Sequence, residues 1–149
     1  MSSTEPADHR DRRARLIVEQ ESLRQEWRPG VTTQMKASAG LGSETLCVFE
    51  QYSKPGTGAP EHTHPEHEEV ILVIDGEVDI TVDGATHRLV RGAAVIIPAG
   101  IAHSFINAGE ELLHTVATFA DPAPTVIYTD EPTAKFTIGT TDSAERLRS

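Results

Sequence analysis

The chain has 149 residues, the size of one domain, and its 13 Lys and Arg against 23 Asp and Glu give a formal net charge of −10 at pH 7. This acidic balance, with only 5% aromatic residues, argues against nucleic acid as a partner, because nucleic-acid surfaces need clustered basic and stacking side chains. The apolar runs are far shorter than the roughly 20 residues of a membrane span, so we expect a soluble cytoplasmic protein without a membrane partner.

The two ends of the chain differ in composition from its middle. Residues 1–30 are treated as an N-terminal extension, in which a thin apolar stripe between charged residues from Asp8 to Trp27 predicts a partly helical segment. The residues from Asp121 onward are rich in Pro and Thr, and we expect an edge strand at Thr125–Thr129. Residues 131–149 are then a C-terminal tail.

From Val31 onward the pattern is typical of β-strands. Short segments rich in β-branched residues are separated by Gly, Pro, Asn and Asp. The glycine-containing stretch 39–42 predicts a hairpin connection, and Asp83-Gly84 between two alternating segments predicts a hairpin with a type I′ turn. Many short antiparallel strands predict a β-sandwich or barrel over residues 31–130.

One predicted strand, Val70–Ile74, is apolar on both faces. Because both faces of such a strand should be covered, one face can line the barrel interior. The other face needs a second sheet, the N-terminal segment or a partner subunit. We therefore expect a homodimer.

Histidines and carboxylates gather around one predicted strand. Residues two apart on a strand point to the same side, so His62 and His64 direct both imidazoles to one point. Glu68 and Glu69 follow, and because they are adjacent only one of them can face the same side. His103 begins a distant strand and offers a third imidazole. Histidine pairs at this spacing also occur in strands that bind no metal.

Such a set of donors would suit a transition metal. Neutral imidazole nitrogen binds Zn, Cu, Fe and Ni, and a carboxylate adds charge and hardness. Four protein ligands on an octahedral ion would leave two positions open, which is the condition for metal catalysis rather than for a closed structural site.

The spacing of these residues resembles the two motifs of the cupin superfamily. The motif G-x(5)-H-x-H-x(3–4)-E-x(6)-G is matched by Gly56, His62, His64, Glu69 and Gly76. The motif G-x(5)-P-x-G-x(2)-H-x(3)-N is matched by Gly92, Pro98, Gly100, His103 and Asn107. The two motifs are separated by the short stretch between Gly76 and Gly92, which is similar to the spacing in small single-domain microbial cupins. The first motif resembles its germin version. The resemblance implies an all-β fold, a double-stranded β-helix or jelly-roll barrel, with a short helical or irregular N-terminal extension.

The same resemblance implies which residues form the site. His62, His64, Glu69 and His103 would ligate a divalent ion (Fe, Mn, Ni, Co or Zn), with Glu69 preferred to Glu68 because only Glu69 has the motif's step to Gly76. Three roles are open for His67: an exposed loop histidine, an alternative ligand, or a base beside the ligands. Glu68 is a second candidate for a position beside the ligands. The two-residue period of the strands adds five candidates for the pocket wall: Met35, Phe49, Gln51, Phe105 and Asn107. Asn107 also fits a structural role, in which it hydrogen-bonds a loop.

For the function, two hypotheses remain from the sequence. The first is a small metal-dependent enzyme, an oxygenase or dioxygenase or else a lyase or isomerase, acting on a small organic molecule inside the barrel. The second is a non-catalytic, metal-dependent module that binds or senses a small molecule. The sequence assigns no catalytic residue beyond the proposed ligands, because the function is determined by the site and not by the fold.

Overall fold

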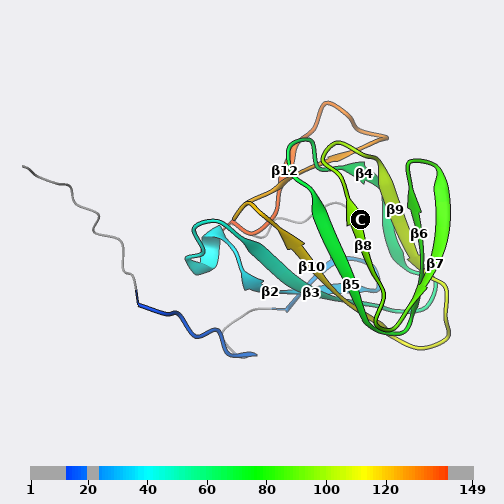
Figure 1. The fold of residues 1–149 in the computed structure, drawn as a ribbon, viewed down its shortest axis with the longest axis horizontal. Coiled ribbons are helices and arrows are strands. Elements are labelled where there is room, and N and C mark those ends of the chain that lie inside the picture. Colours follow the sequence, from blue (N-terminus) through cyan, green and yellow to red (C-terminus); the bar gives the residue numbers. More distant parts are fainter. Residues whose placement is uncertain (1–12, 20–23, 141–149) are drawn as a thin grey trace, which may run out of the picture.

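The computed structural model describes residues 13–19 and 24–140, and these form two antiparallel sheets of six strands each (Figure 1). The first sheet has the order β1 (Arg24–Arg28), β2 (Val31–Ala37), β3 (Cys47–Ser53), β10 (Leu113–Phe119), β5 (Glu69–Asp75) and β8 (Ala94–Ile97). The second has the order β12 (Phe136–Thr137), β11 (Thr125–Tyr128), β4 (Gly58–Thr63), β9 (His103–Asn107), β6 (Glu77–Val82) and β7 (Ala85–Val90). The predicted all-β jelly-roll fold is confirmed.

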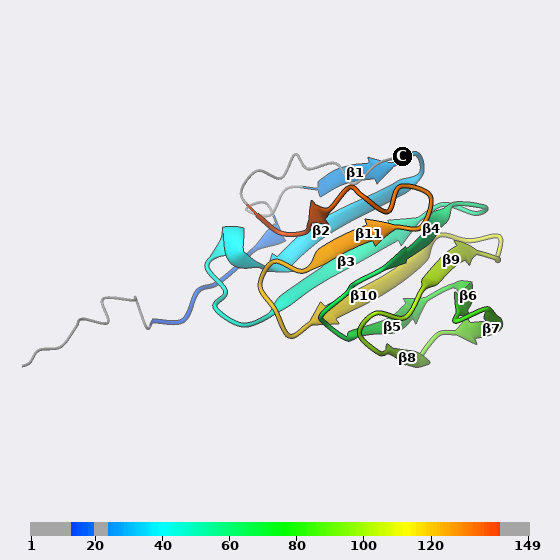
Figure 2. The ribbon, with the colours of Figure 1, turned by 90° about the horizontal axis from the view of Figure 1, so that it is seen from above.

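Strict alternation of buried and less buried side chains shapes the middle of the first sheet. Both β3 and β10 bury every second residue, so each presents one face to the interior. Figure 2 shows the strands of this sheet side by side, with β1 at its edge next to β2. The sequence pattern therefore sets which side chains of β3 and β10 point between the sheets.

The two predicted hairpins are present. A short 3-10 helix, η2 (Ala39–Leu41), connects the antiparallel strands β2 and β3. Between β6 and β7, Asp83 and Gly84 have φ values of 52° and 84°. Positive φ at both central residues defines the type I′ turn, which Asp-Gly adopts readily.

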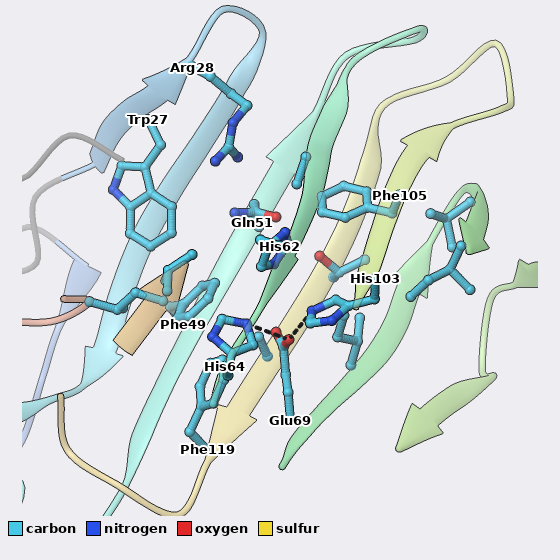
Figure 3. A pocket seen from close by; sticks show the side chains of 18 of the residues that line it. Trp27, Arg28, Phe49, Gln51, His62, His64, Glu69, His103, Phe105 and Phe119 are labelled. Atoms are coloured by element: carbon cyan, nitrogen blue, oxygen red, sulfur yellow. Dashed lines mark hydrogen bonds and ion pairs between the residues drawn. The ribbon is translucent and has the colours of Figure 1, made fainter. Parts of the chain in front are cut away.

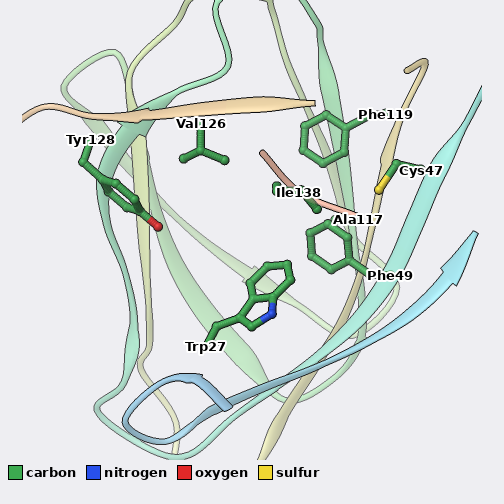
Figure 4. Packing of buried hydrophobic residues seen from close by; sticks show 8 residues of the cluster. All are labelled: Trp27, Cys47, Phe49, Ala117, Phe119, Val126, Tyr128 and Ile138. Atoms are coloured by element: carbon green, nitrogen blue, oxygen red, sulfur yellow. The ribbon is translucent and has the colours of Figure 1, made fainter. Parts of the chain in front are cut away.

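An aromatic cluster fills part of the space between the sheets (Figure 4). Trp27 from β1 packs against Phe49 from β3 with ring centroids 5.1 Å apart, and Phe49 stacks on Phe119 from β10. Cys47 is fully buried beside them, as expected for a strand position. Burial, with the nearby charges of Glu69 and Asp121, raises the pKa of the Cys47 thiol to about 12. This cysteine is therefore a packing residue and not a reactive thiolate.

The prediction of a helix between Asp8 and Trp27 is wrong for its last residues, which belong to β1. Residues 24–28 form this strand, which pairs with β2, and residues 13–18 have no regular secondary structure. The rest of the predicted helix lies outside the described residues. Pairing with β2 and burial of Trp27 override the weak helical pattern, because tertiary contacts commonly outweigh local propensity.

At both ends, the sheets extend past the range of 31–130 expected for the barrel. β1 lies before this range and β12 after it. The predicted edge strand at Thr125–Thr129 is β11, but it is not an edge, because β12 pairs with its outer side. Residues 141–149 of the predicted tail lie outside the described residues.

The strand that is apolar on both faces is β5. Its inner side chains Ile71 and Val73 are buried, whereas Leu72 and Ile74 on the outer face are 38% and 37% exposed. Within residues 13–19 and 24–140, neither the other sheet nor the N-terminal segment buries this outer face.

In the described part of the chain, we find no helix with the length and apolar character needed to cross a membrane.

Candidate metal centre

Four side chains from three regions of the sequence converge between the two sheets (Figure 3). His62 lies in β4, His64 directly follows this strand, and His103 is the first residue of β9. β4 and β9 are neighbours in the second sheet, and their pairing places His62 opposite His103. Glu69 opens β5 in the first sheet. The cluster thus joins the two sheets, with imidazoles from one and a carboxylate from the other.

The four groups are close enough to bind a single ion. One potential ligand atom from each residue lies within 4.8 Å of all the others, and all four residues are buried. The Glu69 Oε1 atom lies 3.2 Å from His64 Nε2 and 3.1 Å from His103 Nε2. The rings of His62 and His103 have centroids 4.2 Å apart.

Backbone carbonyls orient all three imidazoles. The Nδ1 atoms of His62, His64 and His103 lie 2.7, 2.9 and 3.0 Å from the carbonyl oxygens of Pro60, Thr125 and Ile101. Since a carbonyl can only accept, the hydrogen bonds assign the proton to Nδ1 in each ring. In the neutral ring, each Nε2 atom then carries a lone pair. This is the arrangement that protein frameworks give to metal-binding histidines.

Burial and neighbouring charge shift the protonation of the cluster. Burial, together with the charges of His103 and His64, lowers the pKa of His62 to about 3, so this imidazole stays neutral. Burial also lowers the pKa of His103, but hydrogen bonding and attraction to Glu69 outweigh it and raise the pKa above the ordinary histidine value. Burial would raise the pKa of Glu69, yet the hydrogen bond with His103 and the adjacent imidazoles of His64 and His103 hold it well below the usual range. The carboxylate is therefore ionised.

The residues fit a divalent transition metal. His64 Nε2 is buried and has no hydrogen-bond partner, and it faces a carboxylate oxygen that is also an acceptor. With its proton on Nδ1, the Nε2 lone pair of His64 faces the lone pairs of this oxygen without a proton between them. A cation would relieve this repulsion, and nitrogen with one carboxylate is a donor set for Zn, Fe, Ni or related ions.

The cluster opens into a cavity with about 650 Å³ of empty space, its mouth included. Aromatic and aliphatic side chains form most of its wall, and Phe49, Gln51 and Phe105 of the predicted pocket are among them. Met35 and Asn107 do not line it. Met35 faces the interior but packs against the aromatic cluster. Apolar walls with a few polar groups are typical of sites for small organic molecules.

Asn107 has a structural position. Its Nδ2 atom donates hydrogen bonds to the carbonyl oxygens of Ser53 and Glu111, and its Oδ1 atom accepts one from Gly109 N–H. These bonds fasten the loop after β9 to the end of β3. Of the two roles open for this asparagine, the structure supports the loop-bonding one.

The two other predicted neighbours of the cluster lie away from it. His67 Nε2 is 3.2 Å from Asp121 Oδ2, and its partly buried side chain does not line the cavity. Glu68 is exposed, as expected if only one of two adjacent carboxylates faces inward. Glu69 is the inward one.

Several cavity residues were not predicted from the sequence. Trp27 and Arg28 come from the predicted N-terminal extension, and Tyr128 comes from the strand expected at an edge. The signal that could have found the first two is the Pro29-Gly30 turn between Arg28 and Val31, since Pro followed by Gly is a strong turn signal and can close a hairpin. The sequence offers no comparable signal for Tyr128.

The comparisons with known proteins agree with this architecture. The model of the family described as Cupin domain matches residues 49–119, which include all four residues of the cluster. Among solved structures, KdgF from Halomonas sp. superposes with a TM-score of 0.63 at 18% identity, covering 72% of this chain and 94% of that one. At this identity the likeness concerns the fold alone.

Two characterised relatives belong to different functional classes. The chain is 29% identical over 109 residues to the HTH-type transcriptional regulator PuuR of Escherichia coli, over 70% of this chain and 58% of the regulator. It is 42% identical over 50 residues to quercetin 2,3-dioxygenase of Bacillus subtilis, over 34% of this chain and 15% of the enzyme. The chain thus spans little more than half of the first relative and a small part of the second.

Proposed function

Because the chain belongs to the cupin superfamily and carries a converging His-His-Glu-His cluster, we propose that it is a small metal-dependent enzyme. Its reaction would be that of an oxygenase or dioxygenase, or of a lyase or isomerase, on a small organic molecule held between the sheets. His62, His64, Glu69 and His103 would hold the ion. The local similarity to quercetin 2,3-dioxygenase supports the oxygenase form of this proposal.

One observation carries the proposal: three imidazole Nε2 atoms and one carboxylate face a common point at the edge of a cavity. A bound divalent ion would supply Lewis-acid activation of a substrate oxygen at that point. Four protein donors would leave a position on such an ion open for this oxygen. A purely structural metal site would instead be closed on all sides by protein.

The side chains around the cluster would position the substrate and keep water away. Phe49, Phe105 and Phe119 line the wall beside the imidazoles and offer no hydrogen bonds. The exclusion of water strengthens the electrostatic interactions within the site. Gln51 is one of the few polar groups of the wall, and it already donates a hydrogen bond to Thr33 at 3.2 Å, which fixes its amide.

A second function is favoured by the similarity to a transcriptional regulator. The alignment with PuuR covers 70% of the chain. A binding or sensory module would use the same cavity and cluster to recognise a small molecule, without turnover.

Metal analysis and turnover measurements test the two functions. Protein purified without oxygen is expected to bind a stoichiometric divalent ion, and His62→Ala and His103→Ala should lose it. The matched control is His87→Ala, which removes an exposed histidine from β7. Oxygen consumption or product formation with a panel of small aromatic and hydroxylated compounds then separates the two functions. Thermal stabilisation by a compound without turnover would favour the sensory module. Unchanged metal content in both cluster variants would contradict both functions.

We also propose that the protein is a homodimer through the outer face of β5 and β8. Leu72 and Ile74 are partly exposed there, and Ile96 on the neighbouring strand is 63% exposed. Val70 pairs with Ile96 across the two strands, so the apolar side chains form one continuous surface. A contiguous apolar patch of this kind is typical of an interface. The cytoplasmic location expected from the sequence stays a prediction.

A further inference from the structure

A β-bulge places two consecutive residues of β1 inside the barrel. The pairing of β1 with β2 is regular as far as Glu26 and shifts between Glu26 and Arg28. In a regular strand neighbouring side chains point to opposite faces, but here Trp27 and Arg28 are both only 7% exposed and both line the cavity. Bulges are common beside functional sites, where they redirect a side chain.

Arg28 extends into the cavity, with its guanidinium directed toward Gln51 and His62 (Figure 3). Its Nη2 atom donates a hydrogen bond of 2.6 Å to the hydroxyl of Tyr128. The Tyr128 ring in turn lies 5.6 Å from the His62 ring, measured between centroids. One tyrosine therefore separates this cation from the proposed metal ligands.

The charge of Arg28 is not compensated by the protein in the described ranges. Its Nε atom is buried without a hydrogen-bond partner, and no carboxylate from residues 13–19 or 24–140 forms an ion pair with it. The Tyr128 hydroxyl satisfies one donor but does not neutralise the charge. Buried cations in folded proteins are normally paired, because an isolated buried charge is strongly unfavourable.

The rest of the cavity also lacks a free negative charge. Among the residues that line it, Arg28 is the only Lys or Arg and Glu69 the only carboxylate. Glu69 is already occupied by His64 and His103. With a divalent ion in the cluster, the cavity would hold an excess of positive charge, which an anionic ligand would balance.

We propose that this site takes a small organic acid, with its carboxylate on Arg28 and another oxygen of the same molecule toward the His-Glu cluster. The inference rests on the proposed function, which supplies the second attachment point. A guanidinium fork matches a carboxylate with two parallel hydrogen bonds, and a single positive charge balances a single negative one. Trp27, Phe49 and Phe105 provide apolar walls for the carbon skeleton between the two ends.

Trp27 supplies a direct readout of binding, because it is the only tryptophan of the chain and lines the same cavity. We would titrate the protein with acetate, benzoate and 3,4-dihydroxybenzoate, each beside its own amide, and follow the tryptophan emission. At least one acid should bind about tenfold or more tightly than its amide, since only the acid forms a charged pair with the guanidinium. The inference is overturned when no acid binds more tightly than its amide.

Variants of two arginines on the same strand test the assignment to Arg28. Arg28→Met should abolish the preference for the acid, and Arg28→Lys should keep part of it because the charge remains without the fork. Arg24→Met is the matched control: Arg24 lies on the outer side of β1 near the Tyr52 ring and should keep the full preference. An undiminished preference in a folded Arg28→Met protein, verified by circular dichroism, overturns the inference. If that variant does not fold, Arg28→Lys and the acid–amide comparison in the unmodified protein still decide.

The same titrations on metal-loaded and metal-free protein keep the two proposals apart. A preference for acids in a protein that takes up no metal contradicts the metal-dependent function and leaves the role of Arg28 intact. Stoichiometric metal uptake without any preference for acids contradicts the role of Arg28 alone.

Discussion

At the scale of single residues, metal binding by the His-His-Glu-His cluster depends on which nitrogen of each imidazole carries the proton. Three backbone carbonyls hold the Nδ1 protons, so the Nε2 lone pairs are committed to the interior before any ligand arrives. The fixed orientation lowers the reorganisation needed for binding. Substitutions that preserve shape but change charge or protonation are therefore the most informative tests.

The first prediction concerns Glu69→Gln, which keeps the size of the side chain and removes its charge. Metal affinity should fall by about tenfold or more, since losing a ligand should cost at least as much as losing a group that only orients one. Isothermal titration with Zn or Mn measures this change. Glu68→Gln alters the exposed neighbour and should bind the ion normally. An equal loss in both variants, or in neither, would contradict the assignment.

The second prediction concerns acidity. An imidazole coordinates only when neutral, and the raised pKa of His103 makes it easier to protonate than His62, whose pKa lies at about 3. As the pH falls, protons therefore compete with the ion first at His103. We expect bound metal to decrease as the pH falls through the raised pKa of His103, starting above about pH 6.5, and to be strongly reduced by about pH 4.5. Metal analysis after dialysis across this range checks it, and full retention at the acidic end would exclude a three-histidine site.

At the scale of elements, the contact between β4 and β9 sets the distance between two of the imidazoles. Gly58 in β4 approaches β9 so closely that an added Cβ would lie 1.9 Å from the Phe105 carbonyl oxygen. The register of this pair also shifts between Ala59 and His62. A glycine is therefore required here by space and not by backbone angle.

A third prediction follows for Gly58→Ala. The methyl group must push β9 away from β4, so the free energy of unfolding should fall by about 1–3 kcal/mol. Metal binding should weaken at the same time, because His62 and His103 lie on these strands. Urea unfolding and metal titration measure the two effects. Gly84→Asn, in an open turn with positive φ that Asn tolerates, should change both only slightly.

Elements whose pattern is local were the ones that could be predicted from the sequence. The Asp83-Gly84 hairpin follows from turn chemistry, and the alternation along β3 follows from the two-residue period. The spacing of His62, His64, Glu69 and His103 also predicted which side chains would meet. Trp27 and Arg28 could not be predicted, because a bulge breaks the alternation and because pairing with β2 is a tertiary effect. Met35 and Asn107 were placed in the pocket by period two, which does not reveal that one packs on the aromatic cluster and the other bonds a loop.

At the scale of the whole molecule, the interface proposed on the outer face of β5 and β8 would determine how copies of the chain associate. Its apolar side chains lie on the first sheet, on the opposite face from the cavity. An interface there would leave the interior of each barrel separate. Association and ligand binding should then be independent properties.

The fourth prediction is that Leu72→Glu separates the dimer. A charge in the middle of an apolar interface lacks a partner, so the variant should elute as a monomer while the unmodified chain elutes as a dimer. Size-exclusion chromatography with light scattering measures the mass directly. Val90→Glu places a charge on an exposed apolar position of the second sheet and should leave the mass unchanged. A monomeric unmodified protein would contradict the proposed interface.

The location of the carboxylate has one more consequence. Glu69 belongs to one sheet and the three imidazoles to the other side of the barrel, so an ion bound between them would cross-link the two sheets. Its binding would then raise the melting temperature, and a chelator would lower it. A chain weakened within one layer, such as Gly58→Ala, should regain thermal resistance in a medium rich in the ion. Folding and cofactor supply would thus be coupled, so that scarcity of the ion would shorten the lifetime of the folded chain.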